Sequence, residues 1–297
     1  MIETSEKFVL SGDLQLWTES FGSANCPAVL LIMGGMHQGI MWPDGFCSKI
    51  AEQGYCVIRY DHRDTGQSSS VDFTTHPYSL DDLAHDAVAV LDGYDIQKAH
   101  VVGLSMGGFV AQLLALDYSD RLLTLTLMMS SPDQRVYFAA TMGKGTGGYS
   151  LPPPSPKFIE HLRNARQNPP KTAEEAIQNA VDGWRLCNGD GTPFDAKAMY
   201  RLQQRLWARA KNASAAVNHV FAAAASPGRT ERLGRIAAPT LVVHGQQDPC
   251  LPLEHGVALA KAIPAATLLT IPEMGHLLSP SVCGQVAEMV LEHFRGT

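Results

Sequence analysis

The pattern of apolar and polar positions divides the chain into short buried strands and amphipathic helices that alternate. Continuous apolar runs are typical of strands that are buried on both faces of a parallel sheet. Six such runs occupy residues 28–33, 55–60, 100–104, 122–129, 240–244 and 267–271. Helical patterns lie between or after them, at 43–53, 80–94, 106–118, 253–263 and 282–295. This alternation predicts an α/β fold with a mostly parallel sheet.

Two more strands are expected near the N-terminus. Segments 7–10 and 13–18 flank a Ser-Gly pair, and in the second segment Leu14 and Leu16 alternate with positions such as Trp17. Alternation around a short turn predicts a hairpin, and here it indicates an edge strand. The predicted sheet then has eight strands.

The alternation stops between residues 132 and 235. This stretch holds two proline runs and four or five helical patterns, one of which opens at Thr172 and another of which spans 195–210. It shows no convincing strand. We therefore expect an α/β core and a helical cap domain that is inserted after strand 6 over the carboxyl edge of the sheet. The core comprises residues 1–131 and 236–297, and the cap comprises residues 132–235.

The most specific motif is Gly103-Leu104-Ser105-Met106-Gly107, which follows a predicted strand and precedes a predicted helix. The G-x-S-x-G pattern has chemical meaning only in that strand–turn–helix context. Ser105 must occupy a sharp, strained turn for its hydroxyl to project from the sheet edge, and Cβ atoms at 103 and 107 would collide with neighbouring elements. The motif predicts Ser105 as a nucleophile.

A serine hydroxyl needs a general base, and the base needs a carboxylate that holds its tautomer. His276 follows the last predicted strand and precedes the last helix, where its ring can reach the carboxyl edge of the sheet. Asp248 follows the strand at 240–244, which gives the chain order Ser, Asp, His. Asp133 is the alternative acid, because it follows the strand at 122–129.

A tetrahedral acyl intermediate also needs backbone N–H donors for its oxyanion. The residue after the nucleophile, Met106, supplies one. The loop that follows the strand at 28–33 contains Gly34-Gly35, where the backbone can approach a substrate closely. We expect Gly35 to be the second donor.

These motifs resemble those of the serine α/β-hydrolase superfamily over the whole chain, and they are most similar to aclacinomycin methylesterase-like carboxylesterases. The resemblance is carried by Ile32-Met33-Gly34-Gly35, Arg59-Tyr60-Asp61-His62-Arg63-Asp64-Thr65-Gly66-Gln67-Ser68, His100-Val101-Val102-Gly103-Leu104-Ser105-Met106-Gly107 and Pro272-Glu273-Met274-Gly275-His276. It implies the α/β-hydrolase fold, a Ser105–Asp248–His276 triad, Gly35 and Met106 as oxyanion donors, and a helical cap over the pocket. Met33-Gly34 replaces the His-Gly of many relatives, a change that leaves main-chain donors in place.

The expected activity is cofactor-free hydrolysis of a small-molecule carboxylic ester through an acyl-enzyme, with a methylesterase as one option. A lactonase, a thioesterase and a perhydrolase would use the same triad, so these alternatives stay open. A non-catalytic ligand-binding protein of the same fold is a further alternative. In the loop 61–68, which follows the strand at 55–60, we expect a structural role, with Asp61 paired to Arg63.

Composition narrows the partners. The chain of 297 residues carries a net charge of −6, so nucleic acid is not an expected partner. Its six cysteines are scattered without a C-x-x-C motif, which predicts reduced cytosolic thiols instead of a disulfide framework or a metal site. No signal peptide and no apolar run long enough for a membrane span are apparent, so we expect a cytoplasmic protein. The oligomeric state is not predicted.

Charge is divided unevenly between the predicted core and the predicted cap. Residues 132–235 contain 15 Lys and Arg against 8 Asp and Glu, so the cap is basic and the core acidic. Arg201, Arg205 and Arg209 form an i, i+4 row, which is typical of a solvated helix face. A sharper hypothesis is that the basic cap attracts an anionic or oxygen-rich substrate. The aromatic residues of the cap predict a roomy, apolar pocket for a bulky substrate.

Overall fold

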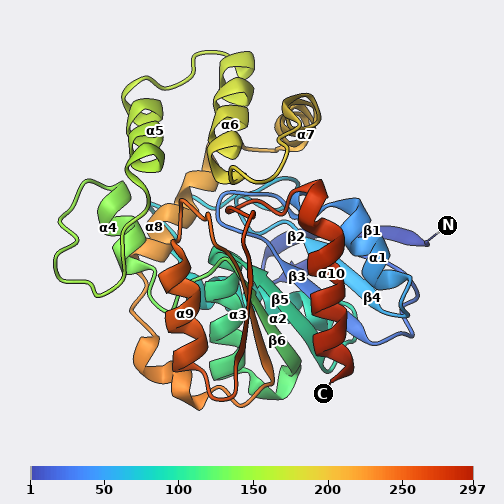
Figure 1. The fold of residues 1–297 in the computed structure, drawn as a ribbon. Helices are drawn as coiled ribbons and strands as arrows, with labels where there is room; N and C mark the ends of the chain where they lie inside the picture. Colours follow the sequence, from blue (N-terminus) through green and yellow to red (C-terminus); the bar gives the residue numbers. More distant parts are fainter. Residues whose placement is uncertain (1, 297) are drawn as a thin grey trace.

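The computed structural model describes residues 2–296 and contains one eight-stranded sheet (Figure 1). Its strands lie in the order β1-β2-β4-β3-β5-β6-β7-β8, with β1 and β2 antiparallel to their neighbours and every other pair parallel. The strands are β1 (Thr4–Ser11), β2 (Leu14–Phe21), β3 (Ala28–Ile32), β4 (Cys56–Tyr60), β5 (Ala99–Leu104), β6 (Leu122–Met128), β7 (Thr240–Gly245) and β8 (Thr267–Ile271). The prediction of a mostly parallel, eight-stranded α/β sheet is confirmed.

Helices cover both faces of the sheet, because successive side chains of each strand point to opposite sides. In β3, Leu30 and Ile32 pack into one apolar cluster, while Val29 and Leu31 pack into another. The first cluster lies under α2 (Leu80–Gly93), α3 (Met106–Asp117) and α9 (Leu253–Ala262). The second lies under α1 (Asp44–Ala51) and α10 (Pro280–Arg295). Among residues 2–296, no helix combines the length and the apolar character that crossing a membrane requires.

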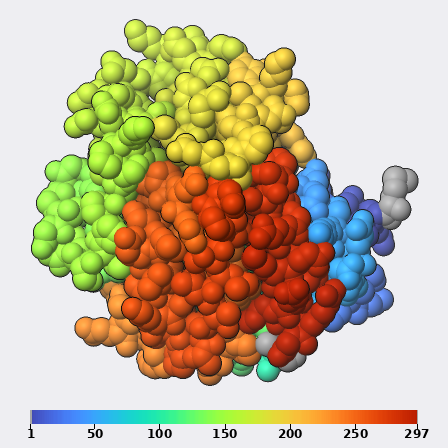
Figure 2. Space-filling model, viewed as in Figure 1, coloured from blue at the N-terminus to red at the C-terminus, as the bar shows by residue number. Residues whose placement is uncertain are grey.

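We call residues 132–235, which lie between β6 and β7, the helical insertion. Its helices are α4 (Arg135–Thr141), α5 (Pro156–Gln167), α6 (Ala173–Cys187), α7 (Ala196–Arg209) and α8 (Asn218–Ala225). In Figure 1, α5, α6 and α7 rise above one end of the sheet, and Figure 2 shows the insertion seated on the C-terminal part of the chain. Helix α6 begins where the sequence predicts. Thr172 is its N-cap residue, and the Thr172 side chain accepts a hydrogen bond from the Glu175 N–H at 3.1 Å.

Two local expectations were wrong. β2 is not an edge strand, because β1 pairs with one side of it and β4 with the other. Trp17 is therefore buried, at 2% exposure, and its indole packs under Arg209 at 4.2 Å. The last helix begins at Pro280 instead of residue 282, since proline suits the first turn of a helix, where its missing N–H costs nothing.

The expected Asp61–Arg63 pair is also absent. Arg63 pairs with the buried Asp86, at 2.7 Å from Nε to Oδ2. Asp61 instead pairs with Arg209 of α7, at 2.8 Å from Nη1 to Oδ2, and it also accepts backbone N–H bonds from Gly39 and Gln67. The sequence could not show this partner, because Asp61 and Arg209 lie 148 positions apart.

This ion pair ties the insertion to the core through a fully buried carboxylate. The Asp61 side chain is 0% exposed and the Arg209 side chain 11% exposed. Burial raises the pKa of Asp61, and Arg209 and the two backbone donors oppose that shift. Removing one partner leaves an uncompensated buried charge, which is strongly destabilising. The ion pair therefore favours the arrangement in which α7 of the insertion lies against the core.

We predict that Arg209→Met lowers the free energy of unfolding by about 3–5 kcal/mol, because it strands the buried Asp61 carboxylate. Arg205→Met is the matched control, since Arg205 is exposed on the same helix, and it should change stability by less than about 0.5 kcal/mol. Urea unfolding measures both. The double variant Asp61→Asn/Arg209→Met should regain part of the free energy of unfolding that Arg209→Met loses, because it removes the stranded carboxylate. Equal losses in Arg209→Met and Arg205→Met, or no regain in the double variant, would contradict this role of the ion pair.

Candidate active site

Ser105 occupies the sharp turn between β5 and α3. Its backbone has φ 55° and ψ −117°, a conformation that L-residues rarely adopt. The turn is possible because its flanks are glycine: a Cβ on Gly103 would lie 2.3 Å from the Gly107 carbonyl oxygen, and a Cβ on Gly107 would lie 2.1 Å from the Ile32 carbonyl oxygen. The Ser130 hydroxyl donates to the Ser105 carbonyl at 2.9 Å and fixes the turn further.

His276 approaches Ser105 from the loop between β8 and α10. The Ser105 Oγ lies 3.0 Å from the His276 Nε2, and the His276 Nδ1 lies 2.6 Å from the Asp248 Oδ2. A carboxylate can only accept, so Nδ1 carries the proton and Nε2 is free to accept the proton of the serine hydroxyl. The backbone N–H of His276 donates to the Cys187 carbonyl of the insertion at 2.6 Å.

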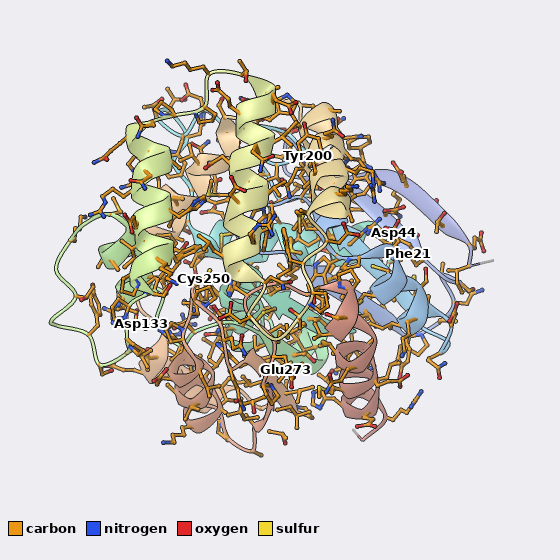
Figure 3. All side chains as sticks on the ribbon, turned by 45° about the horizontal axis from the view of Figure 1, so that its top comes forward. Phe21, Asp44, Asp133, Tyr200, Cys250 and Glu273 are labelled. Carbon is orange, nitrogen blue, oxygen red and sulfur yellow. The ribbon has the colours of Figure 1, made fainter. Side chains whose placement is uncertain are left out.

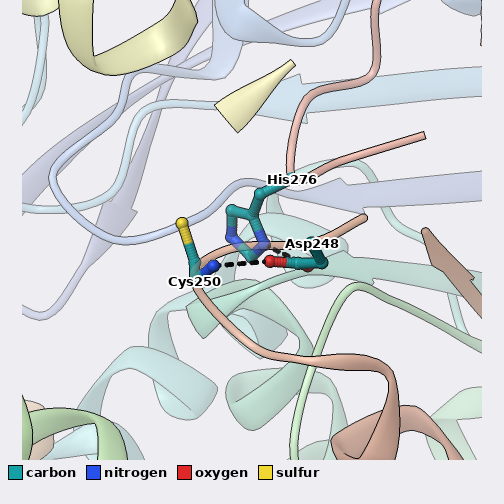
Figure 4. Close-up of side chains that lie close together, drawn as sticks. All are labelled: Asp248, Cys250 and His276. Carbon is teal, nitrogen blue, oxygen red and sulfur yellow. Dashed lines mark hydrogen bonds and ion pairs between the residues drawn. The ribbon is translucent and has the colours of Figure 1, made fainter. Parts of the chain in front are cut away.

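Asp248 is held in the loop after β7 and is buried (Figure 4). Its Oδ1 accepts the backbone N–H groups of Cys250 and Leu251, both at 2.8 Å, which leaves Oδ2 for His276. Burial on its own would raise the pKa of Asp248, but the neighbouring His276 and His244 rings and the backbone donors outweigh it and lower the pKa. The carboxylate therefore stays ionised beside the imidazole.

The alternative acid, Asp133, has different contacts. Its carboxylate accepts two hydrogen bonds from the Arg135 guanidinium, at 2.8 and 2.7 Å, and within residues 2–296 it makes no hydrogen bond or ion pair with His276. Among the described residues, the structure thus brings Ser105, His276 and Asp248 into one hydrogen-bonded chain and leaves Asp133 outside it.

The two expected oxyanion donors lie on facing segments. A Cβ on Gly34 would sit 3.3 Å from the Ser105 Cβ, and a Cβ on Gly35 would sit 3.0 Å from the Met106 sulfur, so the glycines let this loop lie against the turn at Ser105. Met106 is the first residue of α3, where a helix leaves its N–H groups without intrahelical partners. Within residues 2–296, no hydrogen bond occupies the Gly35 N–H.

Sequence reasoning missed His219 of α8. Its Nδ1 accepts the Met36 N–H at 2.9 Å, so its Nε2–H donates to the Arg63 carbonyl at 2.8 Å. Met36 follows Gly35 and has φ 67°, so the insertion holds the strained end of this loop. Burial, followed by the nearby His62, lowers the pKa of His219 to about 3. No sequence signal marks this contact, because the two residues lie 183 positions apart.

A cavity of about 320 Å³ lies between the core and the insertion, with Ser105 and His276 in its wall. Most of the lining is apolar, and the insertion contributes Tyr137, Phe138, Phe158 and Trp184 to it. His37 also lines the cavity, with its ring centroid 4.9 Å from that of Trp184. None of the three arginines of the α7 row lies on this wall: Arg201 and Arg205 are exposed, and Arg209 binds Asp61.

The cysteines gave no sequence signal, yet two of them meet at the cavity. The sulfurs of Cys187 and Cys250 are 3.5 Å apart, and both residues are buried and line the cavity wall. In Figure 3, Cys250 lies between the lower ends of α5 and α6, close to where the insertion meets the core. Their separation of 63 positions explains why spacing alone did not pair them.

An eight-stranded sheet with a serine on the turn between β5 and α3 has the architecture of the α/β hydrolases. Residues 27–280 match the family described as alpha/beta hydrolase fold, which covers most of the chain. The chain belongs to this family.

Relatives and solved structures agree with this membership. The chain is 39% identical to rhodomycin D methylesterase DnrP from Streptomyces peucetius over 293 residues, covering 97% of this chain and 98% of the relative. It is equally similar to rhodomycin D methylesterase DauP from Streptomyces sp. strain C5, at 39% identity over the same length. The solved 2-hydroxy-6-oxo-6-phenylhexa-2,4-dienoate hydrolase from Rhodococcus sp. strain RHA1 superimposes with a TM-score of 0.79 at 21% identity, covering 99% of this chain and all of that one, and supports the fold alone.

We predict that Gly107→Ala lowers the free energy of unfolding by at least about 1–3 kcal/mol, because its Cβ meets backbone that cannot rotate away. The matched control is Gly45→Ala in α1, where a Cβ meets nothing within 4 Å and alanine should stabilise the helix by about 0.5–1 kcal/mol. Thermal and urea unfolding measure the difference. Similar values for the two variants would contradict the steric account of the turn.

We also predict a pH-dependent contribution from His219. Its folded pKa lies below the unfolded value of about 6.5, so as pH falls below that value the unfolded chain binds the proton first and stability is lost. Between pH 7.5 and 5.5 this group alone should remove about 1.4 kcal/mol. In His219→Gln the free energy of unfolding should fall by about 1.4 kcal/mol less between these two pH values than in the wild type. In the control His85→Gln, at an exposed histidine, the fall should equal that of the wild type. Denaturant unfolding at the two pH values checks it, and an unchanged loss in His219→Gln counts against a neutral, buried imidazole.

Proposed function

We propose that this chain is a serine carboxylic ester hydrolase, and within that class a methylesterase, with Ser105 as nucleophile, His276 as general base and Asp248 as the acid that orients it. One observation carries the proposal: the continuous chain from the Ser105 Oγ through His276 to Asp248, at 3.0 and 2.6 Å, opens onto a cavity. The near full-length similarity to two enzymes named methylesterases supports an ester as the bond that is cleaved.

The geometry supports each step of acyl transfer. The Ser105 oxygen attacks the ester carbonyl carbon while its proton passes to the His276 Nε2, and the carbonyl oxygen becomes an oxyanion between the N–H groups of Gly35 and Met106. Asp248 stabilises the imidazolium that forms. The tetrahedral intermediate collapses, the carbon–oxygen bond to the alcohol breaks, and His276 returns the proton to the leaving alkoxide.

The second half repeats this chemistry with water. His276 takes a proton from a water molecule, the resulting hydroxide attacks the acyl-Ser105 carbonyl carbon, and collapse releases the carboxylic acid as the proton returns to Ser105. The turn therefore has to present Ser105 Oγ to His276 in both halves, and the hydrogen bonds to Asp248 keep the same ring orientation throughout.

The cavity supports a bulky, apolar acid part in the substrate. A volume of about 320 Å³ with a largely apolar wall is more than a short-chain ester fills. We further propose that residues 132–235 act as a cap domain over a core of 1–131 and 236–297, since the insertion supplies four of the five Phe, Tyr and Trp side chains that line the cavity. A lactone or a thioester places the same carbonyl before the same serine. The kcat/KM values of matched esters, lactones and thioesters therefore have to be compared to distinguish these activities.

We predict that the protein turns over p-nitrophenyl acetate and p-nitrophenyl butyrate and that Ser105→Ala lowers kcat by about 10⁴–10⁶-fold. Asp248→Asn should lower kcat by a factor on the order of 10⁴, because the wrong tautomer is then held. The exposed Ser70→Ala serves as control. Absence of turnover together with no fluorophosphonate labelling of Ser105 would leave the non-catalytic alternative standing.

The preference for methyl esters needs a separate measurement. With aromatic acids of increasing size, each supplied as the methyl ester, the thioester and the lactone where one exists, release of the carboxylic acid should show the highest kcat/KM for the methyl esters of the larger acids. A higher kcat/KM for lactones or thioesters at equal acid size would replace the methylesterase by that activity.

A further inference from the structure

The joint between the insertion and the core brings two thiols to the wall of the cavity. Cys187 is the last residue of α6, and Cys250 lies in the loop between β7 and α9. Both are buried, and their sulfurs are 3.5 Å apart. They are free thiols in the structure, so two soft donor atoms face each other across two different parts of the chain.

The same thiols adjoin the residues proposed for catalysis. The Cys250 N–H donates to Asp248, and the Cys187 carbonyl accepts the His276 N–H. A sulfur of Cys250, a carboxylate oxygen of Asp248 and a ring nitrogen of His276 all lie within 4.8 Å of one another (Figure 4). The Cys187 sulfur lies beside the Cys250 sulfur, at 3.5 Å, at the edge of this group of three donors.

This donor set suits a thiophilic divalent ion. Two sulfurs, an imidazole nitrogen and a carboxylate oxygen are the ligand types of tetrahedral zinc sites. With Zn–S bonds of about 2.3 Å, two thiolates on one tetrahedral ion lie about 3.8 Å apart, close to the separation found here. Calcium and magnesium need six or more oxygen ligands, so neither matches this set.

We propose that Cys187, Cys250, Asp248 and His276 form an inhibitory binding site for Zn²⁺ or a comparable soft divalent ion. Binding displaces the two thiol protons to solvent and forms two metal–sulfur bonds without any change of oxidation state. The His276 Nδ1 and the Asp248 carboxylate become the remaining ligands. The Nδ1 proton moves to Nε2, so the imidazole can no longer accept the proton of Ser105. It also joins α6 to the loop after β7.

Metal binding is tested apart from activity. The reduced, anaerobic wild-type chain is titrated with Zn²⁺ in equilibrium dialysis and with Cd²⁺, whose thiolate complexes absorb in the ultraviolet. We expect one tight ion per chain, a thiolate–cadmium band and a raised Tm on Zn²⁺ addition. Cys187→Ser and Cys250→Ser should each weaken binding by at least about 10-fold. Cys26→Ser, at a partly exposed cysteine outside the cavity, should bind as the wild type does.

Ser105→Ala separates this inference from the proposed function. It should bind Zn²⁺ and Cd²⁺ as the wild type does, so the binding result stands or falls without any esterase activity. Loss of the cadmium band in Cys26→Ser but not in the two other cysteine variants would overturn the site.

Inhibition, which rests on the proposed function, is tested on ester hydrolysis. Zn²⁺ should inhibit the wild type, a chelator should restore it, and the Zn²⁺ concentration for half-inhibition should rise at least about 10-fold in Cys187→Ser and Cys250→Ser, each compared with its own metal-free rate. Equal sensitivity in these variants would mean that the ion binds His276 without the thiols and would refute the site. Recovery by a thiol reductant instead of a chelator would identify oxidation of the cysteine pair as the event and would also refute it.

Discussion

The site depends on one steric constraint, the close approach of the turn at Ser105 to the ends of the neighbouring strands. A positive φ at a serine is costly, and it persists only where the surroundings over-determine it. Here the Gly107 position lies against the Ile32 carbonyl, and the Gly103 position lies against Gly107. Because no side chain fits in these gaps, the strand, the turn and the helix take up one arrangement, and the hydroxyl is directed toward His276.

The rest of the site is shared between the core and the helical insertion. Arg209 reaches into the core to neutralise Asp61, and His219 holds the N–H of Met36 beside the Gly34-Gly35 loop. The Cys187 carbonyl accepts the N–H of His276. Each of these is a buried polar contact, and a buried polar group that loses its hydrogen-bonding partner lowers the stability of the fold. The insertion thus fixes the positions of groups that belong to the core in sequence.

The sequence was sufficient for the parts of the site that topology determines. Parallel strands end at one edge of a sheet, so residues directly after them meet there, and the meeting of Ser105, Asp248 and His276 could be predicted in this way. The contacts of Arg209, His219 and Cys187 could not be found, because each joins distant segments through helices whose orientation only packing decides. The failed Asp61–Arg63 pair shows the same limit: neighbours in sequence can point to different partners.

The hydrogen bond from His276 to the Cys187 carbonyl has a consequence for how a substrate enters. α6 ends at Cys187, so any movement that lifts this end of α6 from the core also removes the acceptor from the backbone of His276. A ligand admitted by that route would meet a His276 whose backbone N–H lacks this acceptor, while its ring keeps the hydrogen bond to Asp248. The contact between the two parts of the chain would form again only as α6 returns to the core.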